Sequence, residues 1–228
     1  MKTAEHKLNI ISRSDEPFID RIKAGDLLAD ALGHFKGPQT VVLGVPRGGL
    51  VVARQVAHKL KVPFDIVLSR KLGAPQNPEL AIGSISETGE VYLDQDLAQR
   101  VGADEDYLRG ERESQFAEIQ RRRKVYRRVC PKIDLRNKIV IVTDDGIATG
   151  ATVQSAFKSI RQEKPRKLIG AFPVGPEDTL KRLSMLADEI ICLKAPSFLE
   201  GVGQFYFNFG QVSEEEVLNI LKECRESS

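Results

Sequence analysis

Short runs of apolar residues recur along the chain, separated by turns and by segments with a different period. A continuous apolar run of about four to eight residues is typical of a strand that is buried on both faces of a sheet. We therefore predict buried strands at residues 40–45, 64–68, 139–142, 167–174 and 189–193.

The segments between these strands have the period of helices. Apolar residues at helical spacing predict an N-terminal helix within residues 18–35, which is closed by Gly37 and Pro38. The same spacing predicts helices near residues 50–60, 154–163, 177–187 and 213–224. Strands that alternate with helices form a mostly parallel sheet covered by helices on both faces. The sequence therefore predicts a three-layer, Rossmann-like α/β fold.

Residues 73–94 interrupt this alternation with Gly, Pro and other turn residues. Within them, apolar residues 80–82 and 91–93 flank residues 87–90, which is the pattern of a β-hairpin. An excursion of this length is typical of a functional lid or of a disordered insert. A helical region at residues 94–129 follows it.

The chain has 228 residues and a hydrophobic content of 41%, which is enough for a core in one domain. We predict a single domain over residues 1–228, with its core at about 38–195 and a helical insert at 94–129. The aromatic tail at residues 195–212, together with the N-terminal segment, is expected to form a hood over this core.

Charge and cysteine content narrow the function classes. Lys and Arg number 34 against 32 Asp and Glu, so the net charge of +2 gives no overall bias towards nucleic acid or a membrane.

Cys130, Cys192 and Cys224 lie far apart without metal-ligand spacing, and we expect them to be reduced structural thiols. Residues 1–17 lack an apolar signal core and no run has the length of a membrane span, so we expect a cytoplasmic protein.

The candidate chemistry begins where the predicted strand at residues 139–142 ends. Asp144 and Asp145 follow it, at the edge of a parallel sheet where open α/β folds place their ligands. Ionised carboxylates only accept hydrogen bonds, so two of them suit a ligand with two vicinal hydroxyl groups that can donate. The next residues combine backbone N–H groups, two hydroxyls and the positive end of a helix, which suits a phosphate dianion. These residues are Ala148, Thr149, Gly150, Ala151 and Thr152.

This arrangement of a diol site beside a phosphate site fits a ribose 5′-phosphate. Residues 138–152 resemble the phosphoribosyl-diphosphate (PRPP) signature of the type I phosphoribosyltransferase family. Thr143 and Gly146 stand where the family generally has apolar residues, and neither change removes a ligand group. A generic Rossmann-like strand, loop and helix is the alternative, whereas the absence of Gly-Lys-Ser/Thr excludes a Walker A loop. The resemblance implies that Asp144 and Asp145 hold the ribose 2′- and 3′-hydroxyls and that residues 148–152 hold the 5′-phosphate.

Two basic motifs follow the earlier strands. Arg47, Gly48 and Gly49 come after the strand at residues 40–45, and an arginine there can reach a diphosphate while the glycines allow close backbone approach. Arg70 and Lys71 close the strand at residues 64–68. Considered singly, Arg47 suits a structural turn and the other two suit solvated surface cations. The resemblance makes all of them diphosphate ligands, and it implies a cis peptide bond between Pro46 and Arg47.

The resemblance also implies the reaction. A family member transfers the 5-phosphoribosyl group from PRPP to a nitrogenous base and releases diphosphate, largely by positioning and charge stabilisation. Mg²⁺ is expected to arrive with the diphosphate and to reach Asp144 and Asp145 through water at most. Residues 73–94 take the place of the flexible loop that closes over the substrate and excludes water.

The acceptor base is the least determined part. The resemblance places the base near residues 172–175, including Val174, and near Phe205 and Tyr206 of the hood, whose rings could stack on it. Packing within the hood is the alternative for both rings. Hypoxanthine-guanine members carry a lysine in the first segment, and this chain has none between Gly170 and Glu177, which argues against an oxopurine.

The alternative functions concern the basic run at residues 121–128. It could bind nucleic-acid phosphates, which would support a PRPP-sensing regulator with a nucleic-acid or protein partner, but a solvated helix face in which Glu118 pairs with Arg122 is the preferred interpretation. A third possibility is a non-catalytic nucleotide-binding module. For the enzyme we expect PRPP and a base as partners, a homodimer by family resemblance, and neither membrane nor nucleic acid.

Overall fold

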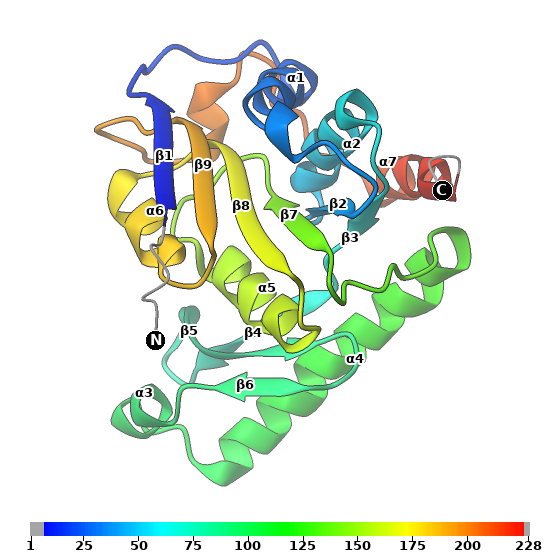
Figure 1. Cartoon of the computed structure of the whole chain (residues 1–228). Coiled ribbons are helices and arrows are strands. Elements are labelled where there is room, and N and C mark those ends of the chain that lie inside the picture. The colour runs from blue at the N-terminus through cyan, green and yellow to red at the C-terminus, as the bar shows by residue number, and fades with distance from the viewer. Residues whose placement is uncertain (1–6, 226–228) are drawn as a thin grey trace.

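A computed structural model of the chain describes residues 7–225 (Figure 1). Residues 1–6 and 226–228 of the predicted domain lie outside this range. The main sheet has six parallel strands in the order β1-β9-β8-β7-β2-β3. In that order the strands are Lys7–Ser12, Glu189–Lys194, Lys167–Val174, Ile139–Thr143, Thr40–Gly44 and Phe64–Ile66. The predicted parallel α/β sheet is confirmed.

Helices cover both faces of this sheet. On one face lie α1 (Arg21–Ala31), α2 (Gly48–Leu60) and the C-terminal α7 (Glu214–Lys222). On the other lie α5 (Ala151–Gln162) and α6 (Glu177–Ser184). Short 3-10 helices complete the main domain at Gly33–Phe35, Val202–Phe205 and Glu223–Arg225.

The central strands explain why the apolar runs identified the sheet. Every residue of β2 is buried, and all but the first residue of β7 and of β8 are buried as well. The edge strand β1 was not predicted, because its residues alternate between exposed and half-buried positions. Leu8 and Ile10 pack onto the core, whereas Ile11 faces solvent.

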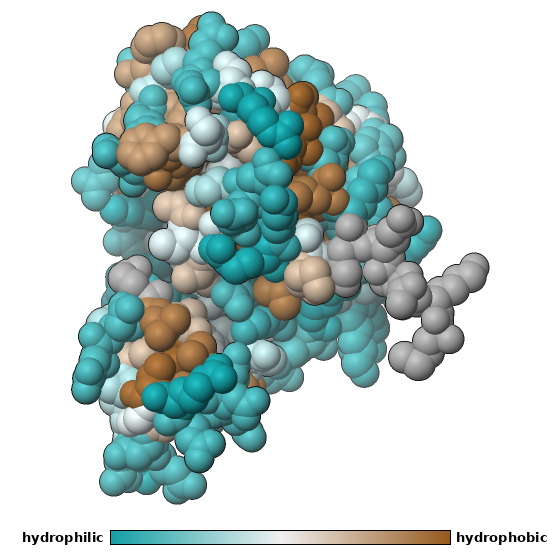
Figure 2. Space-filling model, turned by 90° about the vertical axis from the view of Figure 1, so that its left-hand side faces the viewer, coloured by the Kyte–Doolittle hydropathy of each residue, from teal (hydrophilic) through white to brown (hydrophobic). Residues whose placement is uncertain are grey.

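The residues after β3 form a second lobe, visible at the bottom of Figure 1. It contains an antiparallel sheet of β4 (Ser69–Ala74), β5 (Asn77–Ser86) and β6 (Val91–Leu93), followed by α3 (Gln95–Arg100) and α4 (Glu105–Val129). A small separate core holds it together, with Leu72, Ala74, Ile82, Ile85, Ala98 and Ile119 buried. Figure 2 shows this lobe standing out below the main domain, with a mainly hydrophilic surface around one hydrophobic patch.

The predicted hairpin is present, since β5 and β6 pair in antiparallel register around a turn in which Gly89 has φ 87°. The surrounding segment, however, is a three-stranded sheet rather than a simple loop. Arg70 and Lys71 therefore do not close the strand at residues 64–68, which ends at Ile66; they lie inside β4. The predicted single helical region is divided into α3 and α4.

The C-terminal end of α4 anchors the second lobe to the main sheet. The Arg127 guanidinium lies 2.5 Å from Asp65 of β3 and 2.7 Å from Glu87, which precedes β6. All three side chains are nearly inaccessible to water. Arg127 thus joins β3, the hairpin and α4 through buried ion pairs.

The prediction of three reduced thiols is wrong. Cys130, after α4, and Cys224, after α7, form a disulfide with their Cα atoms 5.9 Å apart, and only Cys192 is free. The two cysteines are separated by 94 positions in sequence, so their pairing depends on how α7 packs beside the end of α4. Of the helices in residues 7–225, none combines the length and apolar content that crossing a bilayer requires.

Candidate functional site

The strand order places two predicted motifs side by side. The chain proceeds from β2 outward to β3, whereas from β7 it proceeds through β8 to β9 in the opposite direction. The crevice between β2 and β7 is therefore the topological switch point, where doubly wound α/β folds bind ligands. Gly44 pairs with Thr143 at the ends of the two strands, and the Val45 N–H donates to the Thr143 carbonyl over 2.9 Å. The loops at residues 45–49 and 144–150 start together at this point.

The acidic pair lies at the end of β7. The Asp145 N–H donates to Asp144 Oδ1 over 2.8 Å, which turns the first carboxylate back over the loop. Burial, followed by the negative charge of Asp145, raises the pKa of Asp144 well above its ordinary value. Two adjacent carboxylates with few solvent contacts are therefore prepared for hydrogen-bond donors such as sugar hydroxyls.

Arg21 is a member of this site that the sequence reasoning missed. It is the first residue of α1, and its Nε donates to Asp145 Oδ2 over 2.7 Å. The two side chains are only 11% and 15% exposed. The same guanidinium donates to the Gly210 carbonyl and lies 3.9 Å above the Phe209 ring. Arg21 therefore connects the acidic pair to the hood.

The predicted phosphate loop forms the N-terminus of α5. Gly150 is the N-cap residue with φ 77°, and a Cβ there would lie 2.8 Å from Thr179 Cγ2. The hydroxyl of Thr149 accepts the Ala151 N–H, while Thr179 donates to the Ala148 carbonyl over 3.1 Å. The first N–H groups of a helix have no partner within the helix, so the loop presents donors at the positive end of α5.

The predicted diphosphate loop packs directly against the acidic pair. The peptide bond between Pro46 and Arg47 is cis, as the sequence resemblance implied. A Cβ on Gly48 would lie 1.9 Å from Asp145 Oδ2, and one on Gly49 would lie 2.8 Å from the Asp144 Cα. Both glycines are therefore required by close approach of this loop to β7. Arg47 is the N-cap residue of α2, makes no side-chain capping hydrogen bond and is exposed.

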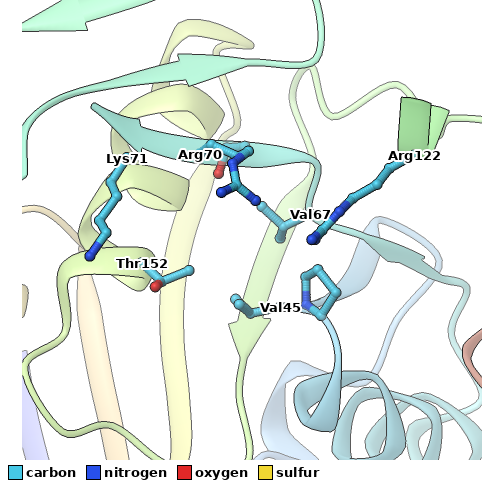
Figure 3. A pocket seen from close by; sticks show the side chains of 8 residues that line it. Val45, Val67, Arg70, Lys71, Arg122 and Thr152 are labelled. Atoms are coloured by element: carbon cyan, nitrogen blue, oxygen red, sulfur yellow. The ribbon is translucent and has the colours of Figure 1, made fainter. Parts of the chain in front are cut away.

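A cavity of about 250 Å³ opens beside this loop (Figure 3). Its walls bring together Val45 and Pro46 of the loop, Thr152 of α5, and Arg70 and Lys71 of β4. Arg122 of α4 also lines it, although the sequence reasoning had placed this residue on a solvated helix face. In Figure 3 the basic side chains enter from the second lobe, opposite Thr152 and Val45.

The candidate base-binding residues lie on the hood side. The Val174 carbonyl accepts the Ile147 N–H, so β8 ends beside the phosphate loop. Phe205 and Tyr206 are only 2% and 5% exposed, and the Tyr206 hydroxyl donates to the Asp145 carbonyl. Tyr206 also stacks on Phe209, with ring centroids 5.1 Å apart. In this conformation the two predicted rings are packing residues, whereas Phe207 and Phe209 of the same segment reach solvent.

Comparison with known proteins gives matches to phosphoribosyl transferases. A family model described as the phosphoribosyl transferase domain matches residues 19–208. A curated protein from each of two Mycobacterium tuberculosis strains, both named "Putative phosphoribosyl transferase", is 42% identical over 204 residues. These matches include 90% of this chain but 46% of each relative, so the chain spans about half the length of the curated relatives it matches. The crystal structure of TT1426 from Thermus thermophilus is similar, with a TM-score of 0.85 and 42% identity over 91% of this chain and 98% of that one.

Proposed function

Because the chain belongs to the phosphoribosyltransferase family, a class of pentosyl-transferring enzymes, we propose that it transfers the 5-phosphoribosyl group of PRPP to a nitrogenous base and releases diphosphate. The observation that carries this proposal is the switch point between β2 and β7. There a glycine loop with a cis peptide bond packs against two carboxylates, and a helix N-terminus follows on the same edge.

The proposed roles follow the chemistry of each group. Asp144 and Asp145 accept hydrogen bonds from the ribose hydroxyls, and Arg21 orients Asp145 through one carboxylate oxygen, which leaves the other available. The loop at residues 148–152 binds the 5′-phosphate through its N–H groups and hydroxyls. The Arg47 loop, Arg70 and Lys71 bind the diphosphate and stabilise the charge that grows on it as the bond to C1 breaks.

The residues suit a magnesium ion that arrives with the substrate. Among residues 7–225, His, Cys, Asp and Glu side chains form no group of three or more that could hold a metal. Mg²⁺ is commonly bound through one or two carboxylates together with substrate phosphates and waters, which the acidic pair could provide. When bound, the ion would neutralise part of the diphosphate charge.

The test is calorimetric titration with Mg²⁺ and PRPP, using the parent protein and a variant carrying both Asp144→Asn and Asp145→Asn. We expect binding in the parent that is lost in the variant, followed by diphosphate release when the correct base is added. A parent protein that binds no PRPP would refute the proposal. Binding without diphosphate release, across a wide panel of bases, would instead favour the regulator or a nucleotide-binding module.

The basic run gives little support to a nucleic-acid partner. Arg121 pairs with Glu118, Arg123 lies 3.5 Å from Glu87, and Arg127, whose side chain is 13% exposed, pairs with two carboxylates. The predicted pairing of Glu118 with Arg122 is confirmed, at 2.7 Å. A homodimer, a cytoplasmic location and a base site at Val174 and the hood are part of the proposal and rest on the family resemblance.

A further inference from the structure

We propose that Arg122, on the helical insert, is an additional diphosphate-binding residue of the PRPP site and acts together with Arg70. The proposal rests on the function proposed above and extends it to a residue outside the recognised motifs. Arg122 lines the same cavity as Pro46, Arg70, Lys71 and Thr152, which places a cation from α4 opposite the diphosphate loop (Figure 3).

Both arginines are held by a hydrogen bond from Nε to a side-chain oxygen of α4. Arg122 Nε donates to Glu118 Oε1 over 2.7 Å, and Arg70 Nε donates to Gln115 Oε1. Within residues 7–225, each of the two guanidinium groups makes this one side-chain hydrogen bond. Each arginine is therefore fixed through Nε, while its two terminal nitrogens remain available to a ligand. A guanidinium presented in this way matches two oxygens of a phosphate group.

The anchors belong to one face of α4. Glu111, Gln115, Glu118 and Arg122 are spaced by three or four residues, which places them one above another on a helix. Glu111 accepts the Gly73 N–H of β4 and also a bond from Gln115 Nε2. A continuous row of polar contacts thus docks α4 on β4 and positions both cations at the cavity.

Glu111 and Glu118 balance the two positive charges only in part, so the cavity favours an anion. Burial lowers the pKa of Arg70 from its ordinary value, and the nearby charge of Arg122 lowers it further. Like charges that share a partly enclosed space repel each other, and a diphosphate between them would turn this repulsion into attraction. The adjacent Lys71 and Thr152 give the cavity further polar groups for the same ligand.

The neighbouring arginines show that this orientation is particular to Arg122. The side chains of Arg121 and Arg123 are 55% and 54% exposed, and neither residue lines the cavity. Arg121 pairs with Glu118 and Glu214, and Arg123 lies 3.5 Å from Glu87. The Arg122 side chain is 28% exposed. Arg123 is consequently a matched control, with the same charge on the same helix but a different direction.

The experiment compares Arg122→Ala and Arg122→Lys with Arg123→Ala. Affinities for inorganic diphosphate, ribose 5-phosphate and PRPP are measured by calorimetry with Mg²⁺ present, and folding is checked by circular dichroism and thermal unfolding. Loss of a charge-assisted contact should weaken diphosphate and PRPP binding by about 10- to 100-fold in Arg122→Ala. Ribose 5-phosphate, which lacks the diphosphate, should bind within about twofold of the parent.

The lysine variant separates charge from geometry. Arg122→Lys keeps the charge but presents a single ammonium, so it should recover part of the diphosphate affinity lost in the alanine variant. Diphosphate affinity that is unchanged in Arg122→Ala, or that falls equally in Arg123→Ala, would overturn the inference and leave the proposed function standing. Conversely, diphosphate binding that depends on Arg122 in a protein that does not bind PRPP would support the anion site and refute the proposed function.

Discussion

Replacement of Arg21 by alanine should destabilise the protein substantially. The guanidinium lies 2.7 Å from Asp145 Oδ2, and the side chains are 11% and 15% exposed, so the pair is largely withdrawn from water. Removing one partner of a buried ion pair costs about 3–5 kcal/mol, since the other charge stays buried without compensation. Both partners keep some contact with solvent, so the expected loss lies at the lower end of this range, about 3 kcal/mol at pH 7. The contacts of Arg21 with the Gly210 carbonyl and the Phe209 ring are lost as well.

Urea-induced unfolding measures this loss directly. Lys23→Ala is the matched control, because Lys23 is exposed on the same helix and should change the free energy of unfolding by no more than about 0.5 kcal/mol. In an Asp145→Asn background the carboxylate charge is absent, so Arg21→Ala should cost less there. The double-mutant cycle should yield a coupling energy of about 1–3 kcal/mol. An Arg21→Ala protein as stable as the Lys23 control would refute the reasoning.

The same variant should alter ligand binding through Asp144. The positive charge of Arg21 lowers the pKa of Asp144, although burial and Asp145 raise it more strongly. Without Arg21 the pKa of Asp144 rises further, so Asp144 becomes protonated at a higher pH. The decline of PRPP affinity on acidification should therefore begin at a higher pH in Arg21→Ala than in the parent. Titrations over a pH series in both proteins test this shift.

Three further outcomes are expected. Since the pKa of Asp144 is raised in the fold, its ionised form destabilises the protein, and Asp144→Asn should increase the free energy of unfolding while it weakens PRPP binding. The increase in the free energy of unfolding should be complete above the raised pKa of Asp144. It should disappear as the pH falls to 3.8, the ordinary pKa of this side chain, and urea unfolding at several pH values would show this. Gly150→Ala should cost about 1–2 kcal/mol for the left-handed backbone alone, with an added clash against Thr179 Cγ2, and should weaken ribose 5-phosphate binding in calorimetry. Reduction of the Cys130–Cys224 disulfide should lower the free energy of unfolding by about 2–4 kcal/mol, and a Cys224→Ser protein should show no further change on addition of the reductant.

The main sheet was predictable because its strands are buried on both faces. Continuous apolar runs identified β2, β7, β8 and β9, and their alternation with helices determined the parallel topology. The edge strand β1 escaped prediction, since an alternating, half-exposed strand has no continuous run. The second sheet was recognised in part, from its hairpin. Its first strand was misassigned because Ser69–Ala74 follows β3 almost without a break.

The candidate site was predictable only where its residues are consecutive in sequence. The acidic pair, the phosphate loop and the glycine loop each occupy a few adjacent positions after a strand, so their combination of residue types is legible. Arg21 and Arg122 are single cations on helices that carry other charges, and nothing in their local sequence distinguishes them from solvated neighbours. Their positions depend on how α1 and α4 pack against the sheets, as does the pairing of Cys130 with Cys224.

Arg21 and Arg122 complete an arrangement in which groups of opposite charge lie beside one loop. Gly48 and Gly49 pack against the two carboxylates, and Arg21 partly balances their charge. Val45 and Pro46 of the same loop line the cavity together with Arg70, Lys71 and Arg122. The proposed substrate, a ribose that carries a diphosphate at C1, has hydroxyl donors for the carboxylates and anionic oxygens for the cations. Only a loop without side chains at residues 48 and 49 allows the two halves to lie this close, which explains why the glycines are required by the site as a whole.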